Sequence, residues 1–485
     1  MKRDTRASRT AYLEQIGPQG KEALERGWTG DLTVGKEESV CVNFRKVRLG
    51  FVNLTLSFLK GQEKAVELSR EIIDYLEKEL DTKVIEFPEL VAQRPQAKQA
   101  WLRFKAENVD AIILFNGTFN TGELVAEIAR NLDCPFALWG LSELALPTRD
   151  FSGSMVAVMA AGTIFKNFGK EFTFIYGTIK EEETRKKVHV FVNTVRAIAY
   201  LKEATIAVIG MRPDGFQIAG ADELAIKKLF GTEIINVSTY TFSKIVKQIN
   251  EKDVDSDIEI QKEIFDIKPD DLLDARGTSR MYLALKKITK EKNIQAYAPE
   301  CWPEFRDVDE TPFCPANSRM STEGVTASCE CDIDGAVTMM LEHAITGNSV
   351  FFADFVNFIK DNDTVLFWHC GNAPYDLAKS KPVCQKIFGG LSTTSALKSG
   401  VVTVCRINSI KGRFMLHAGT GDAIEAEPVL RGSNILVRMR GGNKEFVESL
   451  LENGIPHHNA IVYGDITEEL REFAKFMGIP IVTCS

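Results

Sequence analysis

A run of apolar residues with no polar break is the feature of this sequence that most constrains its fold. Residues 109–117 read VDAIILFNG, with apolar side chains at consecutive positions instead of every second one. Such a strand is typical of a parallel sheet, because helices cover both faces of the sheet and bury every position. The preceding segment at 61–80, GQEKAVELSREIIDYLEKEL, has apolar residues at helical spacing. Strands alternating with helices predict an open parallel α/β sheet.

The same alternation starts again along the chain and then gives way to a different pattern. EFTFIYG at 171–177 and ATIAVIG at 204–210 are expected strands of a second α/β unit. From about residue 345, short strand-like segments separated by turn residues indicate a mostly antiparallel β domain. We therefore expect two consecutive open parallel-sheet, Rossmann-like α/β domains followed by a barrel-like C-terminal domain, with boundaries at 1–165, 166–322 and 323–485.

Composition is informative mainly through the functions it disfavours. A net charge of −8 and a pI of about 5.6 argue against broad electrostatic binding to nucleic acid or anionic lipid. The N-terminal MKRDTRASRTAYLEQIG lacks the apolar core of a secretory signal, and no run approaches the ~18 apolar residues of a membrane-spanning helix. The ten cysteines show no CxxC and no framework spacing. We expect a cytoplasmic protein with no nucleic-acid or membrane partner.

An adjacent pair of histidines stands out because the chain has only six histidines. His457 and His458, in GIPHHNAIVYGD, follow glycine and proline and precede an apolar strand. A loop that enters a strand is a good support for a rigid ligand, although a surface turn with two polar histidines is the open alternative. His369, in FWHCGNAP, lies at an expected strand end, and a packed or a functional role fits it equally well.

Carboxylates occur in two places where buried structure is expected. Glu330, Asp332 and Asp334 lie in SCECDIDGA at 328–336, between flanks typical of buried segments. Glu304 follows Trp-Pro in CWPEF, where proline fixes the local backbone. If CECDIDG is extended, its three acids point to one side, and their chemistry does not separate them. A lone acid in either place is normally a helix cap or an ion-pair partner.

Two carboxylates on structured segments, with a histidine pair downstream, predict a site for a hard divalent cation. Two carboxylates and one imidazole, completed by water, suit Mn²⁺ or Mg²⁺ better than structural zinc, and Co²⁺ is a further candidate. The cation would offset the cost of removing the carboxylates from water.

These segments resemble the family of metal-dependent aldose–ketose isomerases that includes L-fucose isomerase and L-arabinose isomerase. The matching pieces, in order, are CWPEF, SCECDIDGAVTMM, ITGNSVFFADF and PHHNAIVYGDITEELREFAKFMGIPI. The N-terminal half matches in architecture only. The resemblance implies that Glu304 and Asp332 are Mn²⁺ ligands and proton acceptors, and that His458 is the third ligand. It also implies a free sugar as substrate and a homo-oligomer, either a trimer or a hexamer.

The expected function is Mn²⁺-dependent isomerisation of an L-fucose-like, L-arabinose-like or substituted aldose through an enediol. The two carboxylates would act as base and acid in either direction. His369, Asn372 and Asp354 are candidates for hydrogen bonds to sugar hydroxyls, and His457 for a neighbour of the metal ligand. The alternatives are a metal-dependent lyase or hydrolase on a sugar-like substrate, or a non-catalytic sugar-binding protein.

Overall fold

The computed structural model describes residues 44–143, 151–305, 311–360 and 363–484. These residues divide into two compact units, Arg45–Ala199 and Tyr200–Ser485, each described by itself below. The polar N-terminal segment, from which the absence of a secretory signal was predicted, lies outside the described residues. The three-domain division with boundaries at 165 and 322 stays a prediction.

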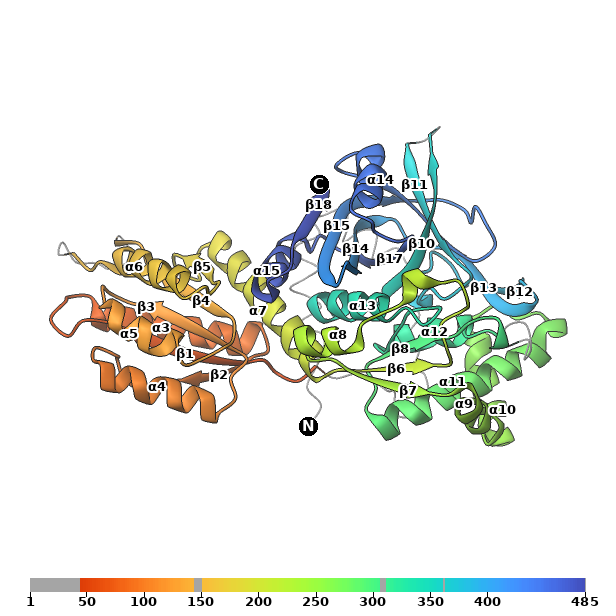
Figure 1. Ribbon diagram of the computed structural model, residues 1–485, viewed down its shortest axis with the longest axis horizontal. Helices are drawn as coiled ribbons and strands as arrows, with labels where there is room; N and C mark the ends of the chain where they lie inside the picture. Colours follow the sequence, from red (N-terminus) through yellow and green to blue (C-terminus); the bar gives the residue numbers. More distant parts are fainter. Residues whose placement is uncertain (1–43, 144–150, 306–310, 361–362, 485) are drawn as a thin grey trace. The chain divides into compact units, whose positions relative to one another are not determined.

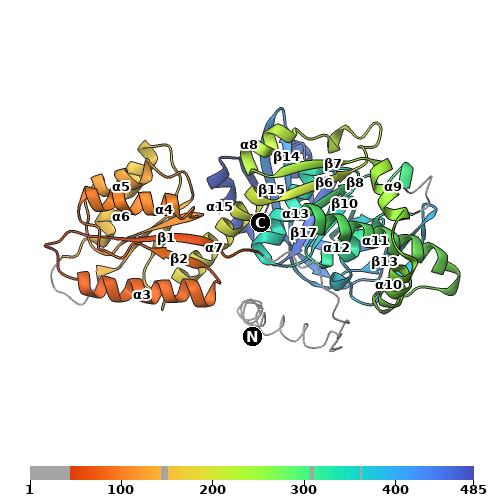
Figure 2. The same cartoon turned by 90° about the horizontal axis from the view of Figure 1, so that it is seen from below.

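The first unit is built on a five-stranded parallel sheet. Every position of its central strand β3 is buried, as the unbroken apolar sequence predicts. Figure 2 shows α3 on one face of the sheet and α4, α5 and α6 on the other. In spatial order the strands are β2 (Lys83–Glu86), β1 (Arg48–Leu54), β3 (Ala111–Asn116), β4 (Phe136–Gly140) and β5 (Thr173–Tyr176). The helices are α3 (Gln62–Glu79), α4 (Arg94–Ala106), α5 (Gly122–Ala129), α6 (Ser154–Asn167) and α7 (Glu182–Glu203), the last of which leads into the second unit.

Strand β5 differs from its sequence-based placement. The sequence grouped it with the second α/β unit, but it pairs in parallel with β4 and forms an edge of the first sheet. Its pattern is that of an edge strand, because Thr173 and Ile175 are buried while Phe174 and Tyr176 are exposed.

The second unit begins with another parallel sheet, of four strands. Its strands, in spatial order, are β7 (Glu233–Val237), β6 (Thr205–Ile209), β8 (Ala296–Pro299) and β9 (Thr326–Ala327). The helices of this part are α8 (Glu223–Phe230), α9 (Thr239–Lys247), α10 (Glu251–Ile264), α11 (Leu272–Lys292) and α12 (Cys314–Thr322). The second predicted parallel sheet is therefore confirmed.

The C-terminal strands form a mixed, mostly antiparallel nine-stranded sheet that closes into a ring (Figure 1). Six strands make the ring in the order β16-β11-β10-β17-β14-β15, and β15 pairs back to β16. The predicted barrel-like architecture is thus confirmed. The strands are β10 (Val350–Ile359), β11 (Thr364–His369), β12 (Val383–Ile387), β13 (Gly390–Ala396), β14 (Gly400–Ile410), β15 (Arg413–Ile424), β16 (Ser433–Met439), β17 (His458–Tyr463) and β18 (Ile481–Cys484), with α14 (Asn443–Glu452) and α15 (Thr467–Met477) between the last strands.

Helix α13 (Ile333–Thr346) joins the two sheets of the second unit. It contacts β8 and β9 of the parallel sheet and β10, β14 and β17 of the ring. Every residue from Ile333 to Ile345 is buried, so this part of the helix has no face exposed to solvent. The helix ends at Gly347, whose positive φ of 71° suits glycine. Its first turn therefore lies fixed inside the protein, beside the ring.

The buried carboxylate of Glu342 on this helix should make the stability of the protein depend on pH. Glu342 is fully buried and neither carboxylate oxygen has a hydrogen-bond partner among the described residues. Burial raises its pKa well above 4.5, so the folded state holds a proton that the unfolded state releases. Stability is therefore lost as the pH rises from about 4.5 toward the folded pKa. Across that window, the free energy of unfolding of Glu342→Gln should rise relative to that of the wild type by up to about 1.4 kcal/mol per pH unit. Thermal unfolding at several pH values checks this, with exposed Glu448→Gln as control; parallel curves would contradict it.

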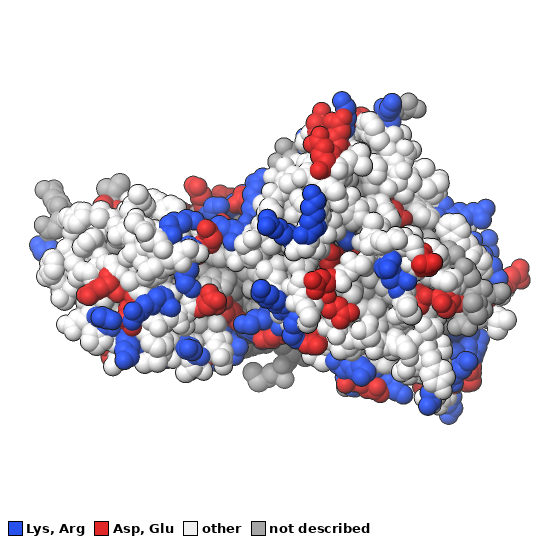
Figure 3. All heavy atoms as spheres, in the orientation of Figure 1, with Lys and Arg blue, Asp and Glu red and all other residues white. Residues whose placement is uncertain are grey.

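Three further features concern the described helices, the surface charge and the cysteines. No helix of the described residues is both apolar enough and long enough to cross a bilayer. On the face that Figure 3 shows, acidic and basic side chains are interspersed. Free thiols are carried by Cys301, Cys314, Cys329, Cys331, Cys384, Cys405 and Cys484.

Candidate metal centre

The cysteine-flanked acidic segment forms a tight turn between the second sheet and α13. β9 ends at Ala327, and Asp332 caps the helix by accepting a hydrogen bond from the backbone N–H of Gly335 at 2.8 Å. Between them, Glu330 and Cys331 both have a left-handed backbone with φ of 56°. This conformation is uncommon for residues other than glycine, and it gathers at functional sites. The segment is a turn and not a strand.

The turn separates three acids that the sequence alone did not distinguish. Alternation applies only to extended backbone, so the acids do not share one side here. Glu330 lies beside His458, whereas Asp332 is buried at the start of the helix. Asp334 instead accepts a hydrogen bond from the backbone N–H of Ser409 at 3.2 Å, and burial raises its pKa to about 6.

Asp332 is a buried carboxylate whose two oxygens are both engaged. Oδ1 accepts from Gly335 N and from Nη2 of Arg406 at 2.9 Å. Oδ2 accepts from Nη1 of Arg406 at 2.8 Å and lies 2.8 Å from Nδ1 of His458. Burial alone would raise the pKa of Asp332, but Arg406 and His458 overcome it and hold the pKa well below its usual range. The carboxylate is therefore ionised and fixed.

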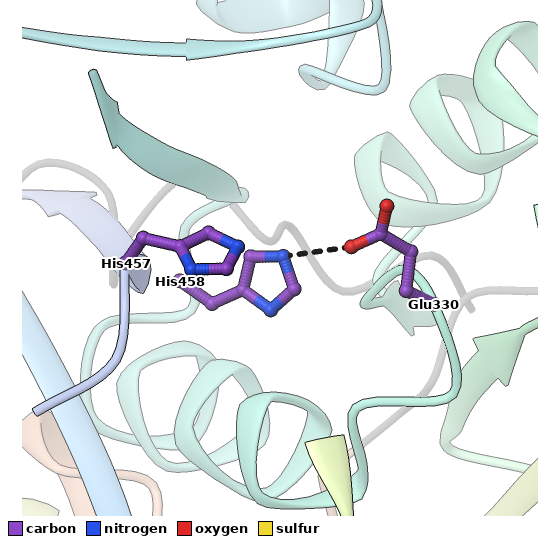
Figure 4. Close-up of side chains that lie close together, drawn as sticks. All are labelled: Glu330, His457 and His458. Atoms are coloured by element: carbon purple, nitrogen blue, oxygen red, sulfur yellow. Dashed lines mark ion pairs between the residues drawn. The ribbon is translucent and has the colours of Figure 1, made fainter. Parts of the chain in front are cut away.

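His458, the first residue of β17, is fully buried and has two differently used ring nitrogens. Nδ1 meets Asp332, which leaves Nε2 to face the other acids. Nε2 lies 3.0 Å from Oε2 of Glu330 (Figure 4) and 3.3 Å from Oδ1 of Asp354, but it forms a well-aligned hydrogen bond with neither. Burial alone would lower the pKa of His458, yet the carboxylates of Asp332 and Glu330 raise it to about 9.

Buried donor atoms without partners meet around His458, and they fit a cation. Asp354, His369 and His458 each offer one ligand atom within 4.8 Å of the other two. Oδ1 of Asp354, Nε2 of His369 and Nε2 of His458 have no hydrogen-bond partner in the described chain. Glu330, His457 and His458 make a second group of the same size. Buried polar atoms are normally satisfied, so such a cluster indicates a missing ligand. Carboxylate oxygens and imidazole nitrogen are donors for Mn²⁺, Mg²⁺ or Co²⁺.

The tautomers suggest different roles for the two buried histidines. Nδ1 of His369 accepts a hydrogen bond from the backbone N–H of Cys370 at 2.9 Å. A neutral His369 then carries its proton on Nε2 and donates a hydrogen bond from there. Burial lowers its pKa and so favours this neutral form. In His458 the hydrogen bond from Nδ1–H to Asp332 leaves Nε2 as the nitrogen that would lose its proton and offer a lone pair to a metal.

A cavity of about 230 Å³ opens beside these groups. Glu330, Asp354 and His369 lie in its wall, and Trp302, Trp368 and Phe388 supply aromatic surface. Nε1 of Trp302 also donates to Oε1 of Glu330 at 2.8 Å, which leaves Oε2 of that carboxylate facing His458. Aromatic faces with a few convergent polar groups are typical of a small-ligand site.

Comparison with known proteins assigns the chain to a family. Residues 367–485 match the family described as L-fucose isomerase, C-terminal domain. A sulfoquinovose isomerase from Alkalicoccus urumqiensis is 24% identical over 397 residues, which cover 80% of this chain and 89% of that protein. An L-arabinose isomerase from Anoxybacillus flavithermus is 21% identical over 342 residues, 66% of this chain and 68% of that protein. A solved glucose-galactose binding protein from Geobacillus stearothermophilus aligns over 62% of this chain and 92% of its own at 14% identity, but its TM-score of 0.18 is too low to carry an argument.

The chain belongs to the sugar isomerase family. Its C-terminal residues are an L-fucose isomerase C-terminal domain, and the whole chain is a distant homologue of the sulfoquinovose and L-arabinose isomerases. The resemblance found in the sequence is thereby confirmed. The individual roles of the site residues stay predictions.

The structure of this isomerase brings most of the predicted site residues together. His458 contacts Asp332 and Asp354, and His369 completes one donor group. His457 is partly exposed, and its Nε2 lies 3.7 Å from Oδ1 of Asp354. Asn372 is nearby in sequence, but its amide donates to the backbone oxygen of Phe352 at 3.1 Å.

Glu304 is not part of the donor groups around His458 that the described residues form. It is exposed. Its carboxylate interacts with Glu300, whose pKa is raised to about 7 by burial and by this neighbour. Its predicted part as a ligand and base is open to test.

Sequence reasoning missed two groups at the site. Glu330 was not separated from the other acids, and the left-handed turn that aims it at His458 has no local sequence signal. Arg406 was not considered. It stands in VVTVCRINSI, where a single charge in an apolar strand is a signal of a buried ion pair.

Proposed function

We propose that this isomerase is an Mn²⁺-dependent aldose–ketose isomerase that acts on a free aldose through an enediol. The observation that carries the proposal is that two carboxylates, those of Glu330 and Asp354, both face Nε2 of the buried His458, which belongs to two groups of possible metal ligands. This is the ligand type that the sequence predicted, although Glu330 and Asp354 replace the carboxylates expected there. Hard oxygen donors favour Mn²⁺, with Mg²⁺ or Co²⁺ as replacements.

Isomerisation of an aldose moves a proton between C2 and C1, and the obstacle is the charge that develops on the carbonyl oxygen. A bound divalent cation would stabilise that charge and orient the sugar. The chain must supply a group that takes the proton from one carbon and returns it to the other. Of the two carboxylates predicted for this role, Asp332 has both oxygens engaged in hydrogen bonds. Glu304 therefore remains the candidate.

Other residues support binding of a polyhydroxylated substrate. His369 would donate a hydrogen bond from Nε2 to a sugar oxygen, and His457 offers a partly exposed imidazole on the other side of His458. Trp302 and Trp368 offer flat apolar faces in the cavity. We propose an aldose substrate, unsubstituted or substituted, since the relatives of this chain carry names of both kinds. Assembly as a trimer or hexamer remains a prediction.

Removal of metal should abolish turnover, and Mn²⁺ should restore it. The protein is stripped with chelator, and ketose formation is measured on pentoses, 6-deoxyhexoses and acidic hexoses before and after addition of Mn²⁺. The expected loss is at least about 100-fold, because a Lewis acid of this kind supplies several kcal/mol.

Product analysis separates this proposal from other metal chemistry. A ketose of unchanged composition supports isomerisation, whereas chain cleavage or hydrolysis products would identify a lyase or hydrolase. Full activity in the stripped protein would contradict the metal requirement. Sugar binding with no product from any aldose of the panel would contradict the enzyme assignment.

A further inference from the structure

Arg406 is a fully buried cation that the proposed reaction does not use. It belongs to β14, and its two Nη atoms reach both oxygens of Asp332 at 2.8 and 2.9 Å. A bidentate pair of this kind fixes the carboxylate in position and direction as well as neutralising its charge. The pair lies directly behind His458 and outside the cavity lining.

We propose that Asp332 and Arg406 form a positioning pair that holds His458 with its Nε2 lone pair aimed at the cation. The inference rests on the proposed function. Asp332 would act through the imidazole and would not bind the ion itself. A carboxylate that receives the Nδ1–H of a ligand histidine fixes both the tautomer and the ring orientation, and it increases the basicity of the other nitrogen.

The contacts of Asp332 support this assignment over direct coordination. Its oxygens take four contacts, from Gly335 N, from both Nη atoms of Arg406 and from Nδ1 of His458. A carboxylate has about four lone-pair sites, so none is left for a metal. Asp332 also lies on the Nδ1 side of the imidazole, while the unsatisfied Nε2 faces the opposite carboxylates.

Gly335 makes room for this arrangement. A Cβ at position 335 would lie 2.5 Å from the ring of Phe352 and 2.9 Å from Nη1 of Arg406. The ring of Phe352 in turn packs against His458, with centroids 4.9 Å apart. Gly335 therefore donates its backbone N–H to Asp332 and leaves the space that Arg406 occupies. These two contacts explain why a glycine stands at the last position of DIDG.

A purely structural ion pair is the competing explanation, and the chain supplies a matched control for it. Asp257 and Arg319 form another bidentate pair, with two contacts of 2.7 Å. The side chain of Asp257 is 4% exposed and that of Arg319 is 2% exposed, and neither residue belongs to a donor group. Breaking either pair leaves a buried charge and should destabilise the fold to a similar extent. Only the pair behind His458 should also change metal binding.

The test measures metal affinity directly in the full-length protein. Co²⁺ is titrated into wild type, Asp332→Asn, Arg406→Lys, Gly335→Ala and Asp257→Asn, with binding followed by the visible absorption of the metal. We expect Asp332→Asn and Arg406→Lys to weaken Co²⁺ binding by about 10- to 100-fold, and Asp257→Asn to leave it unchanged. Gly335→Ala, which keeps both charged groups, should weaken it in the same direction. It serves as the test if the charge variants fail to fold.

A second readout separates positioning from coordination. In the Co²⁺-loaded wild type, the Nδ1 proton of His458 should give a metal-shifted NMR signal that exchanges slowly with water. Asp332→Asn should speed this exchange or remove the signal. If Co²⁺ binds the wild type but Asp332→Asn binds it as well as Asp257→Asn does, the inference is wrong. It is also wrong if Asp332→Asn abolishes binding while Arg406→Lys leaves affinity and NMR signal intact, because Asp332 is then a ligand. Failure of the wild type to bind Co²⁺ would overturn the proposed metal centre itself, and the inference with it.

Discussion

Replacement of His458 by glutamine is expected to lower kcat/KM for aldose isomerisation by about 1000-fold or more, equivalent to about 4 kcal/mol of transition-state stabilisation. His458 Nε2 is the atom shared by both donor groups, so its removal leaves Glu330 and Asp354 without a common partner. In this variant Asp332 also loses its contact with Nδ1 of His458. Ketose formation gives the rate, and metal content of the purified variant gives the loss of the ion.

His457→Gln is the matched control for this prediction. It removes the neighbouring imidazole, which is 41% exposed and lies farther from Asp354 than His458 does, at 3.7 Å against 3.3 Å. We expect this variant to keep its metal and to lose about tenfold or less in kcat/KM, chiefly through a higher KM. Equal losses in the two variants, or a His458→Gln protein that retains its metal, would contradict the assignment of His458 as the central ligand.

The layers of the fold were predictable because they follow from burial patterns within single segments. The unbroken apolar run of β3 requires cover on both faces, and the short strand-like segments separated by turn residues after residue 345 predict a β domain. Strand β5 shows the limit of such reasoning. Its own sequence predicts a strand, but the choice of the first sheet over the second depends on contacts with β4. Pairing partners are set by tertiary packing, which a local pattern does not encode.

The residue types that meet at the candidate site were predictable from the sequence, but which acids lie beside His458 was not. The pair at 457 and 458 lies at the start of an apolar strand, and strands β10 and β17 bring Asp354 opposite His458 in the ladder. The choice among the three acids of CECDIDG depended on two left-handed residues, Glu330 and Cys331. Because non-glycine residues rarely adopt this conformation, an extended segment was the natural assumption. Tertiary contacts hold the strained turn in place.

Arg406 was partly predictable: its need for a partner follows from the sequence, but the identity of that partner does not. A charged residue inside an apolar strand signals a buried partner, since an unpaired guanidinium is too costly to bury. The partner, Asp332, lies 74 residues away in sequence, and nothing local identifies it. Sequence therefore predicts the need for an ion pair, while the packing of α13 against β14 decides which carboxylate meets it.

Glu330→Gln and Glu304→Gln are expected to lose activity for different reasons. Each should lower kcat by at least about 100-fold, the usual scale for an essential proton-transfer or ligand group. Glu330 lies beside His458, and burial, which would raise its pKa, is outweighed by His458 and other neighbours that lower it to about 2. An always-ionised carboxylate there suits a cation. Glu330→Gln should therefore weaken Mn²⁺ binding, whereas the exposed Glu304 should be needed for proton transfer but not for affinity.

Calorimetric titration of Mn²⁺ into the two variants decides between the two carboxylates, with exposed Glu448→Gln on α14 as a control for the change in charge. Weak binding in Glu330→Gln with wild-type binding in Glu304→Gln supports the geometry. The reverse pattern would restore the ligand set that the family resemblance implies and would require the segment after Trp302 to move toward His458 when the ion binds. Normal turnover in Glu304→Gln would remove that residue from the reaction and leave the base to be found among the acids lining the cavity, Glu330 and Asp354.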